Sequence, residues 1–317
     1  MKFNRVIGFT FLGLLKIGCI FLFAFSFFPL LEGVPWYLDL LAHFRFQYLV
    51  LSVIFLITFI HFRKKMFVAL SLSIFLVNAI FVTPGFVSDR VQKPETNGQK
   101  IRLFHSNVLT SNSDYSRLVN QLLLENPDII VLQEVDKSWI KYLSRIKEQY
   151  KYFVEFPRQD NFGIALFSRI PISSQRIHYW GGFNLPSIEA EFMLGDVSFS
   201  IVATHPPPPV SAQYHEARNS QILSVANRVR AISNAKVVIG DLNTSIWSAH
   251  YRALELGTGL ANANKGFGYI PTWPTKLAPM MISIDHCLVS EHFNVLNLKS
   301  GKNIGSDHLP LIVDLEL

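Results

Sequence analysis

Three apolar runs near the N-terminus constrain the chain more than any other feature. Residues 6–31, 48–62 and 66–82 are almost wholly hydrophobic, and Lys16 is the main interruption. A membrane-spanning helix needs about 20 consecutive apolar residues. We therefore expect about three transmembrane helices in residues 1–88. The second run is close to the short limit, so two spans with a re-entrant or interfacial segment are the alternative.

A cleaved signal peptide is a rival explanation of the first run, because Lys2 and Arg5 precede it. Signal peptides have a shorter apolar core that ends at a small-x-small cleavage site. The first run is longer than such a core, no such site ends it, and two more apolar runs follow. These features favour a multi-pass membrane domain over a secreted protein.

The positions of Lys and Arg predict the orientation, because cytoplasmic loops carry an excess of these residues. Lys2 and Arg5 precede the first run, and an Arg-Lys-Lys turn at residues 63–65 separates the second run from the third. The segment between the first two runs has only Arg45. Three spans then place everything after residue 82 outside the cytoplasm. Basic residues after the third run argue weakly for the opposite orientation, namely Arg90, Lys93, Lys100 and Arg102.

The positive charge is concentrated in the N-terminal part. Residues 1–99 hold 9 Lys and Arg against 4 Asp and Glu, whereas residues 100–317 hold 20 against 19. A domain that grips nucleic acid through phosphate contacts usually has a clear positive excess, which counts against a nuclease. We expect a membrane domain over residues 1–88, a polar linker over 89–100 and a soluble domain over 101–317. With only Cys19 and Cys287, no disulfide framework is expected.

Strand-like segments dominate the soluble part. They cover residues 101–107, 128–132, 163–168, 172–180, 188–194, 197–204, 237–241, 282–284 and 309–315. Helical spacing is found at residues 114–125, 137–146 and 211–232. This combination favours two packed sheets with helices outside, an α/β layered sandwich.

The stretch Val237-Val238-Ile239-Gly240-Asp241-Leu242-Asn243 is the clearest buried strand. Side chains at positions i and i+2 of an extended chain point to the same side. We therefore expect the Asp241 carboxylate and the Asn243 amide to face one spot at the C-terminal edge of a sheet.

Polar side chains recur in this way at six predicted strand ends: Asn107, Glu134, His205, Asp241 with Asn243, Asp285, and Asp307 with His308. Carboxylate and amide oxygens suit Mg²⁺ or Mn²⁺, whereas zinc would prefer clusters of Cys and His. Histidines near carboxylates suit metal-assisted hydrolysis of a phosphate ester. The sequence has no Ser-His-Asp arrangement, glycine-rich phosphate loop or zinc spacing.

These residues fall in short blocks whose order resembles that of the endonuclease/exonuclease/phosphatase superfamily, the DNase I-like group. The blocks are Leu132-Gln133-Glu134, Ala203-Thr204-His205, Gly240-Asp241-Leu242-Asn243, Ile284-Asp285-His286 and Gly305-Ser306-Asp307-His308. The resemblance covers residues 101–317 and implies a four-layered αββα sandwich. It also implies a metal-dependent hydrolase of ester bonds.

The resemblance also implies roles for single residues. Glu134 would be the principal metal ligand, with Asn107 and Asp307 close to the metal. His308, paired with Asp285, would orient or activate the attacking water or stabilise the phosphoryl charge. Asp241 would transfer a proton, Asn243 would hold a phosphate oxygen, and His205 would contact the phosphate from the other side. The chain departs from pancreatic-type nucleases because His205 has no clear glutamate partner; the acidic candidates are Glu155, Asp160 and Glu191.

Membrane spans followed by such a domain resemble bacterial plasma-membrane proteins of the superfamily, which carry an outward catalytic domain. That architecture favours a phosphatase or phosphodiesterase acting on a phosphorylated envelope lipid. A membrane-anchored nuclease that cleaves DNA or RNA is the alternative, and a non-catalytic membrane scaffold is a third hypothesis. No protein partner is inferred.

Overall fold

The structure is a computed structural model that describes residues 2–31, 33–87 and 98–317. Of the linker predicted at residues 89–100, all but the last three residues lie outside this described part. The chain divides into two compact units, Met1–Pro84 and Gly85–Leu317. Each unit is described by itself below.

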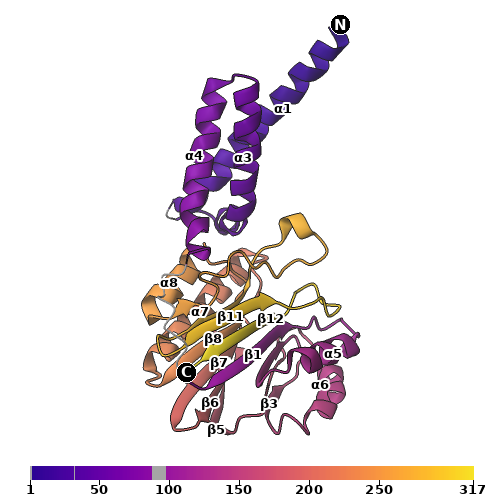
Figure 1. Cartoon of the computed structure of the whole chain (residues 1–317), viewed down its shortest axis with the longest axis vertical. Coiled ribbons are helices and arrows are strands. Elements are labelled where there is room, and N and C mark those ends of the chain that lie inside the picture. Colours follow the sequence, from indigo (N-terminus) through magenta and orange to yellow (C-terminus); the bar gives the residue numbers. More distant parts are fainter. Residues whose placement is uncertain (1, 32, 88–97) are drawn as a thin grey trace. The chain divides into compact units, whose positions relative to one another are not determined.

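The first unit is built from three long helices and one short one. They are α1 (Lys2–Phe27), α2 (Trp36–Asp39), α3 (Arg45–His61) and α4 (Lys65–Val82) (Figure 1). Three stretches are long and apolar enough to cross a membrane: Phe11–Leu30, Trp36–His61 and Lys65–Gly85. The second stretch begins upstream of the apolar run at 48–62, because α2 and a 3-10 turn precede α3 directly. Its 26 residues exceed the length that a span requires.

A buried polar cluster lies inside this unit. The Arg45 guanidinium donates to Asn78 Oδ1 at 3.3 Å, and Asn78 Nδ2 donates to Ser26 Oγ at 2.9 Å. The guanidinium also lies over the Phe81 ring, 3.8 Å from its centroid. A charged side chain in an apolar bundle is stable only with such partners. The cluster therefore ties α1, α3 and α4 together.

The second unit contains two six-stranded sheets. The first sheet has the order β11-β12-β1-β2-β4-β3, and its strands are β1 (Lys100–Asn107), β2 (Ile129–Gln133), β3 (Tyr152–Phe156), β4 (Ile164–Ser168), β11 (Asn294–Ser300) and β12 (Leu311–Glu316). The second sheet has the order β5-β6-β7-β8-β10-β9, and its strands are β5 (Ile172–Trp180), β6 (Leu185–Leu194), β7 (Val197–Thr204), β8 (Ala235–Asp241), β9 (Ala261–Asn262) and β10 (Asp285–Val289). Both sheets contain parallel and antiparallel pairs.

Four helices cover the outer faces of the two sheets: α5 (Tyr115–Glu125), α6 (Lys137–Leu143), α7 (Ala212–Ala231) and α8 (Ala249–Thr258). One apolar core fills the space between the sheets, where Leu103 and Val131 face Ile201 and Val237. A second core joins the first sheet to α5 and α6, and a third joins the second sheet to α7 and α8 (Figure 1). The predicted four-layered αββα sandwich is therefore confirmed.

The elements that the sequence did not predict are mostly peripheral. Strands β3 and β11 form the two edges of the first sheet, and most of their residues are at least partly exposed. An edge strand of this kind lacks the continuous apolar run that marks β2 or β4. Helix α8 was also missed.

One side-chain amide connects the two sheets. Gln133, at the end of β2, donates from Nε2 to the carbonyl of Thr204 at 2.8 Å and accepts at Oε1 from the Asp241 N–H at 2.9 Å. Gly240 makes room for this bridge. A Cβ at residue 240 would lie 2.1 Å from the Thr204 oxygen and 2.5 Å from Gln133 Nε2, and its φ is +154°. Only glycine fits there without moving the bridge.

We expect Gly240→Ala to lower the free energy of unfolding by about 3 kcal/mol, because the added methyl group overpacks the core and strains the backbone. Equilibrium urea unfolding of the full-length chain in detergent measures the change. Gly182→Ala is the matched control, since its Cβ would meet only ordinary contacts at 3.7 Å or more. Equal stability of the two variants would contradict this account.

Candidate active site

The predicted site residues converge on one edge of the paired sheets. Strands β1 and β2 are parallel, as are β7 and β8, so their C-terminal ends deliver Asn107, Glu134, His205 and Asp241 to that edge. Strands β10 and β12 are antiparallel to β8 and β1. The prediction that all of these residues follow a strand is therefore wrong for three of them. Asp285 opens β10, and Asp307 and His308 precede β12.

Asn107 joins the two carboxylates nearest to it. Its Nδ2 donates to Glu134 Oε1 at 2.9 Å and to Asp241 Oδ2 at 3.3 Å, and the amide is almost fully buried. Glu134 is partly exposed and has a left-handed backbone, with φ +62°. The N–H of Thr110 donates to Glu134 Oε2 at 3.2 Å. Glu134 is thus held from two sides although the residue is only partly buried.

Two imidazoles flank Asp241. His205 Nε2 lies 3.5 Å and His308 Nε2 lies 3.6 Å from Asp241 Oδ2, and all three side chains are buried. Burial alone would lower the pKa of His205, but the hydrogen bond and charge of Asp241 raise it above the ordinary value. The carboxylates and imidazoles therefore form one coupled group.

The acidic neighbour of His205 is Asp241 rather than a glutamate. Among the three candidates from the sequence, Glu155 pairs with Lys147, Asp160 pairs with Arg158, and Glu191 accepts from Asn234. Nδ1 of His205 is buried without a hydrogen-bond partner among the described residues.

Asp285 holds two imidazoles. Its Oδ2 accepts from His308 Nδ1 at 2.8 Å and its Oδ1 accepts from His105 Nε2 at 2.9 Å. Burial alone would raise the pKa of Asp285, but the charge of His308 and both hydrogen bonds lower it well below its usual range. Burial alone would lower the pKa of His308, but the charges of Asp285 and Asp241 raise it to about 10. Asp285 therefore orients His308 so that Nε2 points toward Asp241.

The expectation that Asn243 continues the strand is wrong. The residue is left-handed, with φ +50°, and its N–H donates to Asp241 Oδ1 at 2.8 Å. Its Nδ2 donates to the Pro206 carbonyl at 2.9 Å. Asn243 still lies beside Asp241, but it gets there through a tight turn after β8 rather than through the alternation of an extended strand.

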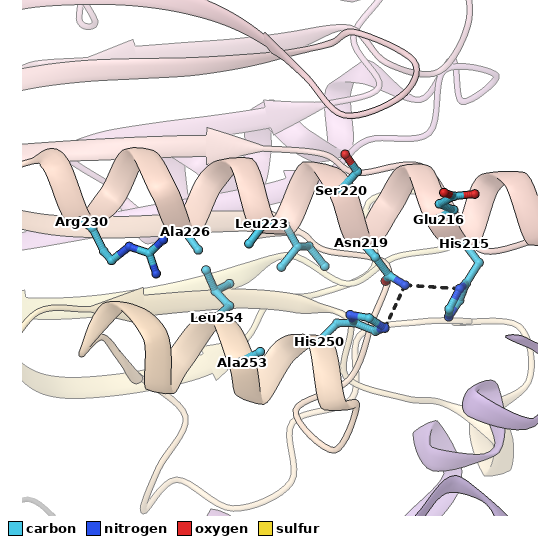
Figure 2. A pocket seen from close by; sticks show the side chains of 11 residues that line it. His215, Glu216, Asn219, Ser220, Leu223, Ala226, Arg230, His250, Ala253 and Leu254 are labelled. Carbon is cyan, nitrogen blue, oxygen red and sulfur yellow. Dashed lines mark hydrogen bonds between the residues drawn. The ribbon is translucent and has the colours of Figure 1, made fainter. Parts of the chain in front are cut away.

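A fully buried arginine supports this turn from α7. Arg218 Nη1 donates to the Asn243 carbonyl at 3.2 Å, and Nε and Nη2 donate to Asn219 Oδ1 at 3.0 and 2.8 Å. Asn219 Nδ2 in turn lies 3.3 Å from His215 Nδ1 and 2.9 Å from His250 Nε2 (Figure 2). Because Asn219 Oδ1 faces Arg218, its amide nitrogen must be the group that donates to both imidazoles.

His215, Asn219 and His250 also line a cavity of about 490 Å³ between α7 and α8 (Figure 2). Leu223, Ala226 and Leu254 form its apolar part, and Arg230 lies toward the C-terminal end of α7. None of the residues predicted for catalysis or metal binding lines this cavity. It is separate from the candidate active site, although Arg218 and Asn219 connect the two.

Asp307 lies on the loop before β12. Its Oδ2 accepts from Trp273 Nε1 at 3.0 Å, and its carbonyl accepts from the Thr275 N–H at 2.9 Å. The neighbouring Ser306 hydroxyl donates to the Asn107 carbonyl at 2.8 Å. The loop that carries Asp307 and His308 is therefore fixed to β1 and to the segment around Trp273.

The donor set fits a hard divalent cation. Ligand atoms of Asp241, Asp285 and His308 lie within 4.8 Å of one another. Both oxygens of Asp285 already accept from imidazoles, so Asp285 is better suited to orienting His308 than to binding a metal. The remaining oxygen donors include Glu134 and Asp307, which are partly exposed. Carboxylate and amide oxygens of this kind favour Mg²⁺ or Mn²⁺ over zinc.

Sequence reasoning missed His105 and Gln133, although a signal was present. Ile101 and Leu103 on β1, and Ile129 and Val131 on β2, face the core between the sheets. His105 and Gln133 continue these alternations, so they are polar residues on the most buried face. A polar side chain at such a position must have a partner, and here the partners are Asp285 and the second sheet.

Comparison with known proteins places this geometry in a family. The model of the Endonuclease/Exonuclease/phosphatase family matches residues 103–308, which is more than half of the chain. No curated protein sequence matches the chain significantly.

Solved structures show the same fold at low sequence identity. Humanized TDP2 from D. rerio is 17% identical with a TM-score of 0.58, and the match covers 69% of this chain and 99% of that one. The human Nocturnin catalytic domain is 21% identical with a TM-score of 0.58, over 74% and 98% of the two chains. Sphingomyelinase C from Streptomyces griseocarneus is 15% identical with a TM-score of 0.52, over 68% and 99%.

The family match covers every predicted site residue from Asn107 to His308. Enzymes of this family depend on a divalent metal and act on phosphoester bonds, in agreement with the residues gathered at the sheet edge. The chain belongs to the endonuclease/exonuclease/phosphatase family and is a hydrolase of ester bonds.

Proposed function

We propose that the chain is a membrane-anchored phosphoesterase that hydrolyses a phosphate ester or pyrophosphate of an envelope lipid. One observation carries the proposal: a single chain combines three candidate membrane spans with the group formed by Asn107, Glu134, Asp241, Asp285 and His308. A soluble substrate would not require the enzyme to be tethered. A phosphorylated lipid is confined to the same surface as the enzyme.

Glu134, Asn107 and Asp307 are proposed to hold Mg²⁺ or Mn²⁺. Such an ion, when bound, polarises a phosphoryl oxygen and neutralises its charge. The hydrogen bonds that Glu134 accepts from Asn107 and Thr110 keep its carboxylate in one orientation. We also propose that the membrane domain ends at residue 88 and that the catalytic domain begins at residue 101.

The distances around Asp241 support the other proposed roles. Asp241 accepts the proton of the attacking water, since its Oδ2 lies between the two imidazoles. His308 is positioned by Asp285 and donates from Nε2 to a phosphoryl oxygen. His205 contacts the phosphate from the opposite side. Asn243 has a second amide hydrogen besides the one bonded to Pro206, and it donates this hydrogen to a phosphate oxygen.

The charge of residues 100–317 supports a lipid substrate over nucleic acid. These residues hold 20 Lys and Arg against 19 Asp and Glu, which leaves no general positive excess for phosphate contacts. Proteins of similar fold include both a sphingomyelinase and D. rerio TDP2 complexed with a single-strand DNA product. The substrate therefore has to be tested directly against DNA.

The membrane is proposed to be the inner (plasma) membrane of a bacterium, with the catalytic domain on the periplasmic or extracellular side. The basic residues before the first span and in the turn at residues 63–65 support this orientation. Envelope lipids with phosphate or pyrophosphate groups are exposed on that side.

We expect the purified full-length chain with Mg²⁺ to hydrolyse a lipid pyrophosphate or a phosphodiester lipid faster than plasmid DNA. Glu134→Ala and His308→Ala remove a metal ligand and a phosphoryl donor, and each lowers the turnover number by at least about 100-fold. Asn243→Ala lowers it by about 100-fold through the loss of one donor. Phosphate release or product chromatography measures the rates.

Asp196→Asn is the matched control, because Asp196 is exposed in the turn at the other end of β7 from His205. It should retain the wild-type rate. Rapid DNA cleavage that depends on Glu134 and His308 would refute the lipid substrate. Activity that survives both substitutions and EDTA would refute the mechanism.

The proposed orientation predicts where the C-terminus lies. Alkaline phosphatase fused after Leu317 should be active in a bacterial host, because that enzyme folds only outside the cytoplasm. A green fluorescent protein fusion at the same position should be dark if it is exported in the unfolded state. The reverse pattern would contradict three spans with a cytoplasmic N-terminus.

A further inference from the structure

A short loop beside the active site exposes apolar side chains. Residues 276–280, called the apolar loop here, read Lys-Leu-Ala-Pro-Met, and all five are exposed. Leu277 is 54% exposed and Met280 is 41% exposed. Single exposed apolar residues are common on soluble proteins, whereas exposed apolar residues that lie together are more typical of a contact surface.

The base of the apolar loop is hydrogen-bonded to the loop that carries Asp307 and His308. Trp273 and Ile282 form a β-bridge that closes it. Thr275 donates from its N–H to the Asp307 carbonyl at 2.9 Å and from its hydroxyl to the Ser306 carbonyl at 3.1 Å. Trp273 Nε1 donates to the Asp307 carboxylate at 3.0 Å. The apolar loop is therefore a rigid extension of the rim of the site.

A second exposed apolar segment lies at the start of the Gly85–Leu317 unit. Gly85, the last residue of the third candidate span, accepts from the N–H groups of Gly266 and Gly268 at 3.0 and 3.1 Å. Phe86 and Val87 follow and are each 53% exposed, and the Phe86 ring lies against Gly268.

Tyr269 connects this segment to the apolar loop. Its hydroxyl donates to the carbonyl of Met281 at 2.8 Å, one residue beyond Met280. The exposed residues Phe86 and Val87 and the exposed apolar loop therefore belong to neighbouring segments of one unit. The first of them follows directly on a candidate membrane span.

We propose that the apolar loop is a lipid-docking element that inserts Leu277 and Met280 into the boundary between head groups and acyl chains. A bilayer is the occupant because Phe86 and Val87 come directly after a candidate span and are linked to the loop through Gly268 and Tyr269. Apolar side chains with an adjacent cation suit an interfacial position, and Lys276 supplies the cation for anionic head groups. The inference goes beyond the proposed function, since it holds whichever phosphoester is cleaved.

Docking would hold the rim of the active site at the lipid surface. Asp307 is joined to the base of the loop by two hydrogen bonds, so its distance from the bilayer is set when the tip inserts. A head-group phosphate could then reach the site while its acyl chains remain in the bilayer.

The test places a fluorescent label at the tip of the loop. Leu277→Cys and Met280→Cys of the full-length chain are labelled with the NBD fluorophore and reconstituted into phosphatidylethanolamine and phosphatidylglycerol vesicles that contain a nitroxide lipid. Ile57→Cys in α3 is the membrane control and Leu124→Cys on α5 is the solvent control; these residues are 64% and 65% exposed. The unsubstituted chain gives the background, because Cys19 and Cys287 are both buried.

We expect the labels at 277 and 280 to show blue-shifted emission and to be quenched nearly as strongly as the label at 57. The label at 124 should show neither effect. Labels at 277 and 280 that behave like the one at 124 would overturn the proposal. A blue shift without quenching would also overturn it, because the tip would then be packed against protein rather than lipid.

Discussion

The active site depends on the side-chain amide of Gln133, which fixes one sheet against the other. Its two hydrogen bonds end on the Thr204 carbonyl and on the N–H of Asp241. Thr204 precedes His205, so His205 and Asp241, the site residues at the ends of β7 and β8, are both positioned by one residue of the first sheet. Because Gln133 is fully buried, losing either partner would leave an unpaired amide that costs about 1–3 kcal/mol. A variant that lost one of the two hydrogen bonds would therefore be strongly destabilised.

The charges of the site are balanced around Asp285. A buried carboxylate is stable only when it is paired and hydrogen-bonded, and Asp285 has His105 on one oxygen and His308 on the other. His105 comes from the first sheet and Asp285 from the second, so this contact also crosses the core. The contacts through Gln133 and Asp285 both cross from one sheet to the other. Gln133 precedes Asp241 in the sequence and Asp285 follows it, but both contacts stabilise the sheet edge that carries the site. The sandwich and the catalytic geometry are thus stabilised by the same bonds.

Most residues of the candidate site could be predicted from sequence because a polar residue after an apolar strand is conspicuous, as at Glu134 and Asp241. The direction of β10 and β12 could not be predicted, because strand pairing is not local, and so Asp285 was assigned to the wrong end of its strand. The left-handed turn at Asn243 was missed because the chain was expected to stay extended beyond Asp241. Arg218 gave no signal, since a helix with many polar residues does not show which one is buried.

The proposed membrane attachment would change how an enzyme of this family selects its substrate. Members share one fold at 14–21% identity with this chain, so the fold alone cannot choose among ester substrates. A tether instead restricts the enzyme to a surface and raises the effective concentration of anything confined there. The hydrogen bond between Trp273 and Asp307 ties the rim of the site to the loop that carries His308, so a contact made at the rim would bear directly on the proposed catalytic residues.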